Sequence, residues 1–238
     1  MNPFAQSVRG ALDLIVNADV ELVRTVALSL SVSGSACLWA SGLGLLAGAA
    51  LAVARFPGLG GVLLLLNTLL ALPSVVVGLA VYLLLSRSGP LGSWGILFTP
   101  AAMVIAQTIL VFTVVAALSR QLVADALREA REPLRSMGAR PFTAALLMLL
   151  HERWAVLTVL LTAFGRAIAE VGAVMIVGGN IEGVTRVMTT TIALETSKGD
   201  LPLALALGLV LLAVVGLLNI AIGLVQRGRY ASMSVHPR

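Results

Sequence analysis

The stretch TVALSLSVSGSACLWASGLGLLAGAALAVA, residues 25–54, decides the class of fold because its 30 residues carry no charged side chain. A helix needs about 20 predominantly apolar residues to cross the hydrocarbon core of a bilayer. Uncharged runs of similar length follow at residues 56–86, 88–119 and 201–226. The pattern predicts membrane-spanning helices near residues 27–54, 62–86, 98–118 and 202–225.

The composition of the whole chain agrees with a membrane protein. Of its 238 residues, 59% are hydrophobic and 11% are charged, whereas soluble domains carry about 25% charged residues. This scarcity of polar surface excludes a soluble globular enzyme and a disordered chain. A disulfide scaffold is excluded as well, because Cys37 is the single cysteine. The net charge is +5, but this total alone does not indicate nucleic-acid binding, which requires basic residues clustered on a polar surface.

Two further segments have helical spacing but carry charges. Residues 154–178 are long enough for a fifth span, interrupted by Arg166 and Glu170. These two residues stand at i and i+4, which favours an ion pair on one helix face, either functional or locking the helix to a neighbour. Residues 4–18 are too short to span and predict an amphipathic helix at the membrane interface. The expected fold is therefore an all-α polytopic bundle of five spans, or six if the N-terminal helix also crosses.

The distribution of Lys and Arg predicts the orientation. With five spans and the N-terminus outside, the inside segments hold 10 basic residues and the outside segments hold 5. Basic residues concentrate on the cytoplasmic side of membrane proteins. The N-terminus is therefore expected outside and the C-terminus in the cytoplasm. Small residues also recur in the spans, and Gly44 and Gly48 form a G-x-x-x-G pattern that lets helices approach closely in lipid.

The cytoplasmic segment 119–153 combines apolar residues at helical spacing with a charged opposite face. Pro133 suits the first turn of a helix, Gly138 suits a helix end, and Pro141 suits the start of the next helix. An amphipathic helix exposed on a protein with little other cytoplasmic mass favours docking to a partner. The alternative is a helix that lies on the lipid surface.

This segment resembles the EAA loop of ABC importer permeases, in which a Glu-Ala-Ala start precedes a glycine by six positions. Glu132 and Gly138 keep this spacing, and Ala139 follows the glycine. The segment departs from the pattern in having Pro133-Leu134 in place of Ala-Ala and His151 in place of the final proline. A second start, Glu129-Ala130, lies out of register just upstream. The resemblance implies that this segment couples to an ATPase through Glu129, Ala130, Glu132, Gly138 and Ala139.

A second segment, residues 165–212, resembles tungstate-type permeases within the molybdate, sulfate and tungstate class of ABC importers. The resemblance rests on GRA (165–167), EVG (170–172), GGNI (178–181), TR (185–186) and ALETSKG (193–199), and extends upstream through residues 65–92 and 98–110. It implies the MetI-like fold of type I importer permeases over the whole chain, 1–238. It also implies a homodimer in the inner membrane, two ATPase subunits, and an external, periplasmic oxyanion-binding protein.

The resemblance implies transport of tungstate, with molybdate or sulfate as the alternative cargo, and no enzymatic activity, cofactor or metal in the chain itself. The chain lacks a G-x-x-x-x-G-K-[ST] phosphate loop, so energy must come from the ATPase. A self-sufficient secondary transporter and a membrane-embedded enzyme are the less favoured classes.

The polar segment 178–200 is the candidate lining of the transport pathway. Its glycines favour backbone amides that point at an oxyanion, its threonines offer hydroxyl donors, and Arg186 is a nearby cation. The alternative is a loop that only contacts the binding protein. The pathway residues expected from this segment and the adjoining span are Arg166, Glu170, Gly178, Gly179, Asn180, Arg186, Thr189 and Thr190.

Overall fold

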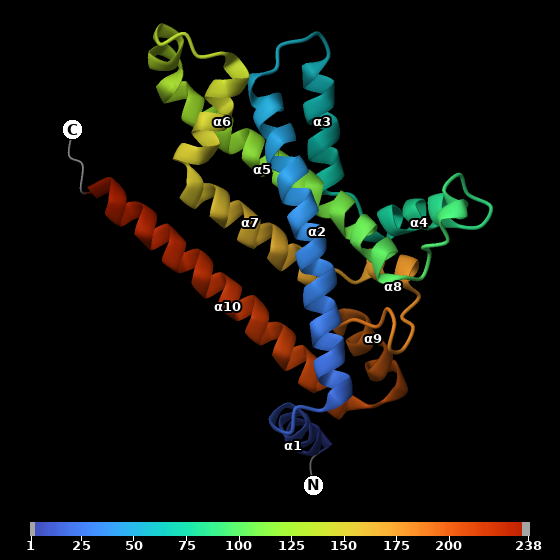
Figure 1. Ribbon diagram of the computed structural model, residues 1–238. Coiled ribbons are helices and arrows are strands. Elements are labelled where there is room, and N and C mark those ends of the chain that lie inside the picture. Colours follow the sequence, from blue (N-terminus) through green and yellow to red (C-terminus); the bar gives the residue numbers. More distant parts are fainter. Residues whose placement is uncertain (1–2, 235–238) are drawn as a thin grey trace. The chain divides into compact units, whose positions relative to one another are not determined.

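The computed structural model describes the backbone of residues 3–234, and the side chains of residues 8–226 except 129, 131 and 135. Within this part of the chain all regular structure is helical (Figure 1). The elements are α1 (Pro3–Val16), α2 (Val20–Val53), α3 (Leu59–Leu70), α4 (Ser74–Leu85), the 3-10 helix η1 (Gly92–Trp94), α5 (Pro100–Ser136), α6 (Pro141–His151), α7 (Arg153–Ile168), α8 (Gly172–Gly178), α9 (Met188–Lys198) and α10 (Leu201–Ser234).

The helices have the length and composition of a polytopic membrane protein, as predicted. Among the described residues, three helical stretches suffice by themselves to cross a bilayer: Val20–Val53, Pro100–Arg128 and Leu201–Gln226. The bent pairs α3–α4 and α6–α7 raise this number to five if each pair forms one span. Helix α1 covers most of the predicted segment 4–18, and its place at the membrane interface remains a prediction.

The predicted span 62–86 is broken. Helix α3 ends at Leu70, and Pro73 is the N-cap of α4 with an extended backbone, φ −60° and ψ 129°. Proline has no N–H to continue a helical ladder, and its ring disfavours a helical residue before it. Pro73 therefore interrupts the predicted span completely, and two separate helices take the place of one.

The predicted span 98–118 is longer than expected and continues as α5 to Ser136. Apolar residues at helical spacing continue through residues 119–130 without an interrupting glycine or proline, so nothing ends the helix there. The expectation that Pro133 lies in the first turn of a helix is wrong, because Pro133 lies within the last turn of α5. The other two expectations hold: Gly138 follows the helix end with φ +77°, and Pro141 opens α6.

The contacts divide the described chain into two compact units, which are described separately. One unit comprises the residues up to Ala36, Pro73–Thr108 and Gly165–Leu217; the other comprises Cys37–Leu72, Ile109–Phe164 and the residues from Leu218. We refer to them as the first and the second unit. The expected pathway residues belong to the first unit, and the expected coupling residues belong to the second.

Each unit contains a helix contact that only glycine permits. In the second unit Gly44 and Gly48 of α2 face α5, and Ser119 of α5 donates a hydrogen bond of 3.2 Å to the carbonyl of Gly44. In the first unit Gly78 of α4 lies against the backbone of Ala173 of α8, where an added Cβ would stand 2.7 Å from that Cα. Close backbone approach over small residues is a usual way of packing helices in lipid.

Candidate functional site

The predicted coupling segment forms the turn between α5 and α6. The chain leaves α5 through Gly138, whose positive φ suits a residue without a Cβ. The N–H of Ala139 then donates to the carbonyl of Leu134 at 3.0 Å, which closes the end of the helix. Pro141 begins α6 at a position where a missing N–H costs nothing. The turn is therefore fixed by local backbone chemistry.

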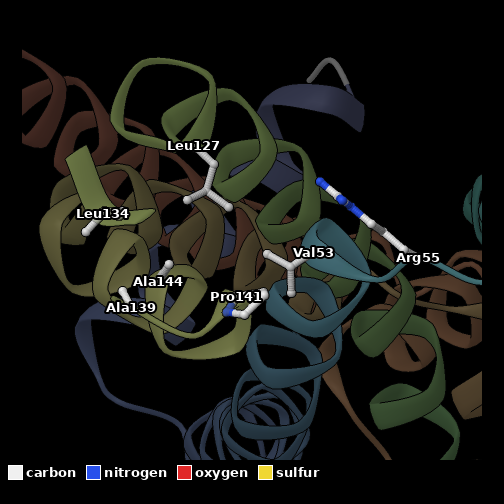
Figure 2. A pocket seen from close by; sticks show the side chains of 7 residues that line it. All are labelled: Val53, Arg55, Leu127, Leu134, Ala139, Pro141 and Ala144. Carbon is white, nitrogen blue, oxygen red and sulfur yellow. The ribbon is translucent and has the colours of Figure 1, made fainter. Parts of the chain in front are cut away.

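An apolar cavity of ≈ 380 Å³ lies beside this turn (Figure 2). Its lining comes from the end of α2, the last turns of α5 and the start of α6. Figure 2 shows the seven side chains, which are Val53, Arg55, Leu127, Leu134, Ala139, Pro141 and Ala144. Leu134 is buried and belongs to the local hydrophobic core together with Leu127 and Ala144. This packing holds the turn against the rest of the second unit.

The predicted coupling residues divide into an anchored set and an exposed set. Ala130 and Ala139 pack against the hydrophobic core, whereas Glu132 and Gly138 are exposed. The side chain of Glu129 lies outside the described residues. Met137 is 74% exposed beside Gly138, which leaves an apolar side chain at the tip of the turn. Sequence reasoning missed Met137, although its position directly before the helix-ending glycine was a usable signal.

Arg166 and Glu170 do not share a helix face. Helix α7 ends at Ile168, so Glu170 falls in the break before α8, and no ion pair joins these two described side chains. The predicted i, i+4 pair is wrong because the helix does not continue through residue 170. Glu170 instead accepts a hydrogen bond of 3.2 Å from the N–H of Ala173 in the first turn of α8. Arg166 is exposed.

The glycines at the end of α8 are committed to closing that helix. Gly179 has φ +70°, and its N–H donates to the carbonyl of Met175 at 3.0 Å. The Gly178 carbonyl accepts the hydroxyl of Thr185 at 2.5 Å. The Gly179 amide therefore does not point at a ligand in this arrangement. Asn180 follows with φ +50° and a buried Oδ1 that has no hydrogen-bond partner within the described part of the chain.

Arg186 is neutralised by carboxylates. Its guanidinium lies 3.4 Å from Glu21 and 3.3 Å from Glu182, and its side chain is 12% exposed. Arg24 donates a hydrogen bond of 2.7 Å to the carbonyl of Gly183 in the same region. These contacts tie the loop before α9 to the start of α2. In this arrangement the guanidinium of Arg186 pairs with carboxylates of the same chain, and its role in the pathway remains a prediction.

A double-mutant cycle tests this role of Arg186. We expect Arg186→Ala and Glu21→Ala to destabilise the protein less together than the sum of the two single effects, by about 0.5–1 kcal/mol. Thermal unfolding of the purified protein in detergent measures the stability of the two single variants and of the double variant. Asp13→Ala paired with Arg186→Ala gives a control cycle within the same unit, because no ion pair joins these two described side chains. Additive effects of Arg186→Ala and Glu21→Ala would contradict the ion pair.

The threonines of the segment are also bonded to backbone. Thr189 donates to the carbonyl of Glu170 at 2.8 Å, and Thr190 donates to the carbonyl of Val187 at 3.1 Å. Both hydroxyls are buried in the first unit. The structure therefore brings Thr189 and Glu170 together, while Thr190 caps its own helix. The polar segment is a bonded cluster rather than an open loop of free donors.

Known proteins resemble this chain over most of its length. A probable anion ABC transporter permease of Haloferax volcanii is 43% identical over 199 residues, which is 82% of this chain and 86% of the relative. The tungstate uptake system permease TupB of Peptoclostridium acidaminophilum is 39% identical over 222 residues, 93% of this chain and 97% of the relative. The sulfate transport system permease CysW of Synechocystis is 32% identical over 183 residues, covering 73% and 66%.

The chain belongs to the ABC transporter permeases. No protein-family model matches it. The membership confirms the predicted resemblance and a multi-pass protein of the cell membrane. It also confirms a transport permease rather than an enzyme, because the relatives are named as permeases. The roles of the individual coupling and pathway residues remain predictions.

Proposed function

We propose that this permease imports tungstate, with two copies of the chain forming the pathway. The observation that carries the proposal is the match to a tungstate uptake permease over 93% of this chain and 97% of that relative. The sulfate transport permease matches at lower identity and over less of both chains. Sulfate is therefore the less favoured alternative cargo, and molybdate is the other alternative; both are tetrahedral dianions, as tungstate is.

We infer that two ATPase subunits dock on the exposed tip formed by Glu132, Met137 and Gly138. The turn is rigid at its base, because Leu134 is buried and Ala139 is hydrogen-bonded to it, while its tip is exposed. A rigid helix end transmits a push to the helices that carry it, so closure of the ATPase pair would move α5. An external binding protein delivers the anion and sets most of the selectivity. With the basic residues inside, the N-terminus lies outside and the C-terminus in the cytoplasm of the inner-membrane protein.

Uptake measurements test the cargo. Membrane vesicles that contain this chain with its ATPase and binding protein are expected to accumulate radiolabelled tungstate only when ATP is present. Unlabelled tungstate should compete fully with the radiolabelled tungstate. A tenfold excess of sulfate should lower tungstate uptake less than the same excess of molybdate does. Vesicles without the permease are the control. ATP-dependent accumulation of sulfate but not of tungstate would overturn the assignment of the cargo.

A further inference from the structure

The apolar cavity beside the predicted coupling turn lies where three candidate membrane spans end. The span formed by α2 ends at Val53, the apolar stretch of α5 ends at Arg128, and the bent pair α6–α7 begins at Pro141. Val53 and Pro141 both line the cavity, and so does Leu127 in the last turn of the apolar stretch of α5. We therefore expect the cavity to lie at the depth where the hydrocarbon core of a bilayer meets the lipid headgroups.

The walls of this cavity suit a hydrocarbon chain. Among the described lining residues, all except Arg55 have apolar side chains. Leu127, Leu134 and Ala144 are buried in the local hydrophobic core, so packing holds these walls in place. The volume of ≈ 380 Å³ falls in the range of about 300–1,000 Å³ that small-molecule sites occupy. A hydrocarbon chain in this space would remove apolar surface from water, which is favourable.

The charge at the cavity is positive and is not neutralised. Figure 2 shows Arg55 at one side of the cavity, separate from the group that contains Leu134 and Ala144. Arg140, the N-cap of α6, precedes the lining residue Pro141 and is exposed, as Arg55 is. The ion pairs found among the described residues involve neither of these arginines. Because the described lining also contains no acidic side chain, the cavity is complementary to a molecule with an apolar chain and a negative charge.

We propose that this cavity binds an anionic phospholipid, with one acyl chain against the apolar walls and the phosphate at Arg55. A guanidinium group binds phosphate oxygens through two parallel hydrogen bonds, and Arg140 adds positive charge next to the lining. Basic pockets beside membrane helices on the cytoplasmic side are typical sites for anionic headgroups. The distribution of Lys and Arg predicts that this end of the second unit faces the cytoplasm.

An anionic phospholipid matches both properties of the cavity, whereas two simpler ligands match one each. A small inorganic anion would pair with Arg55 but would leave the apolar walls in contact with water. A lipid without net charge would cover the walls but would leave Arg55 without a counter-charge. The lipid would lie between the end of α2 and the start of α6, and would thereby support the turn that carries the predicted coupling residues. This site is independent of the cargo that the permease imports.

Lipid binding to the full chain tests the proposal directly. Native mass spectrometry of the purified chain measures how much lipid remains bound as the lipid concentration rises. Phosphatidylglycerol is expected to bind about tenfold more tightly than phosphatidylcholine with the same acyl chains. A ligand that binds the folded state stabilises it, so phosphatidylglycerol should also raise the melting temperature of the chain in detergent. Inorganic phosphate at the same concentration should leave the melting temperature unchanged.

Two substitutions separate the headgroup contact from the acyl-chain contact. Arg55→Gln removes the charge, and should lower the affinity for phosphatidylglycerol about tenfold while the affinity for phosphatidylcholine stays the same. Val53→Phe enlarges a lining side chain and should lower the affinity for both lipids. Arg87→Gln is the matched control, because Arg87 is exposed, belongs to the first unit and takes part in no ion pair among the described residues. Size-exclusion chromatography without added lipid shows whether each variant is folded.

Three results would overturn the lipid site. The first is equal affinity of the unmodified chain for phosphatidylglycerol and phosphatidylcholine, which would show that the headgroup charge is not recognised. The second is unchanged binding of phosphatidylglycerol by both folded variants, Arg55→Gln and Val53→Phe, which would place the lipid elsewhere on the chain. The third is an equal rise in melting temperature with inorganic phosphate, which would identify the ligand as a small anion. None of these measurements uses tungstate, so a failure of the proposed import would not be mistaken for a failure of the lipid site.

Discussion

Replacing Gly48 by valine is expected to destabilise the protein by about 3 kcal/mol or more and to lower its melting temperature by about 6–12 °C. A Cβ at this position would stand 2.7 Å from the carbonyl oxygen of Ala116 and 2.8 Å from the N–H nitrogen of Arg120, besides colliding with the hydroxyl of Ser119. Two of these neighbours are backbone atoms of α5, so no side-chain rotation relieves the clash. The helices α2 and α5 would have to separate, which would also lengthen the bond from Ser119 to Gly44.

Gly42 provides a matched control for this substitution. It lies in the same helix, and an added Cβ would meet nothing within 4 Å. Gly42→Val therefore changes helix propensity to the same extent without a packing clash. Thermal unfolding in detergent, with size-exclusion chromatography to measure the folded fraction, compares the two variants. Equal melting temperatures for Gly42→Val and Gly48→Val would show that α2 and α5 do not pack through Gly48.

The sequence predicted these helix contacts better than it predicted the breaks between helices. The G-x-x-x-G pattern of Gly44 and Gly48 by itself indicates that another helix packs closely against α2, because the missing Cβ atoms leave space for a neighbour. The uncharged run at residues 25–54 likewise predicts a span, because the length and apolar character of a segment can be read from its own residues. Both features are properties of one segment and need no knowledge of its partners.

The break at residues 169–171 depends on partners and therefore escaped prediction. Arg166 and Glu170 stand at the spacing of a helical pair, and apolar residues on both sides suggest a continuous helix. What stabilises the break are Gln107 and Thr189, which lie 60 and 19 residues away from the carbonyls that they bind. Periodicity cannot show a hydrogen bond between distant segments. The hydroxyls of Thr189 and Thr190 looked free for the same reason.

Replacing Gly138 by valine is expected to lower ATP-driven uptake about tenfold or more while the protein still reaches the membrane. An added Cβ at Gly138 would meet nothing within 4 Å, so packing does not resist the change. The backbone does, because φ is +77° and a β-branched residue adopts this conformation at a cost of about 1–2 kcal/mol. The turn would relax to a negative φ and displace Met137 and Glu132 from their positions at the tip.

Gly95 separates this effect from general destabilisation. It also has a positive φ, +62°, with nothing within 4 Å of an added Cβ, but it follows η1 and belongs to the first unit, whereas the coupling turn belongs to the second. Gly95→Val and Gly138→Val should therefore lower the melting temperature by similar amounts, while only Gly138→Val uncouples ATP hydrolysis from uptake. Glu132→Ala, an exposed change at the same tip, should uncouple in the same direction without backbone strain. Because the strain is matched and only the location differs, normal uptake in Gly138→Val and Glu132→Ala would mean that the ATPase pushes on another part of the chain.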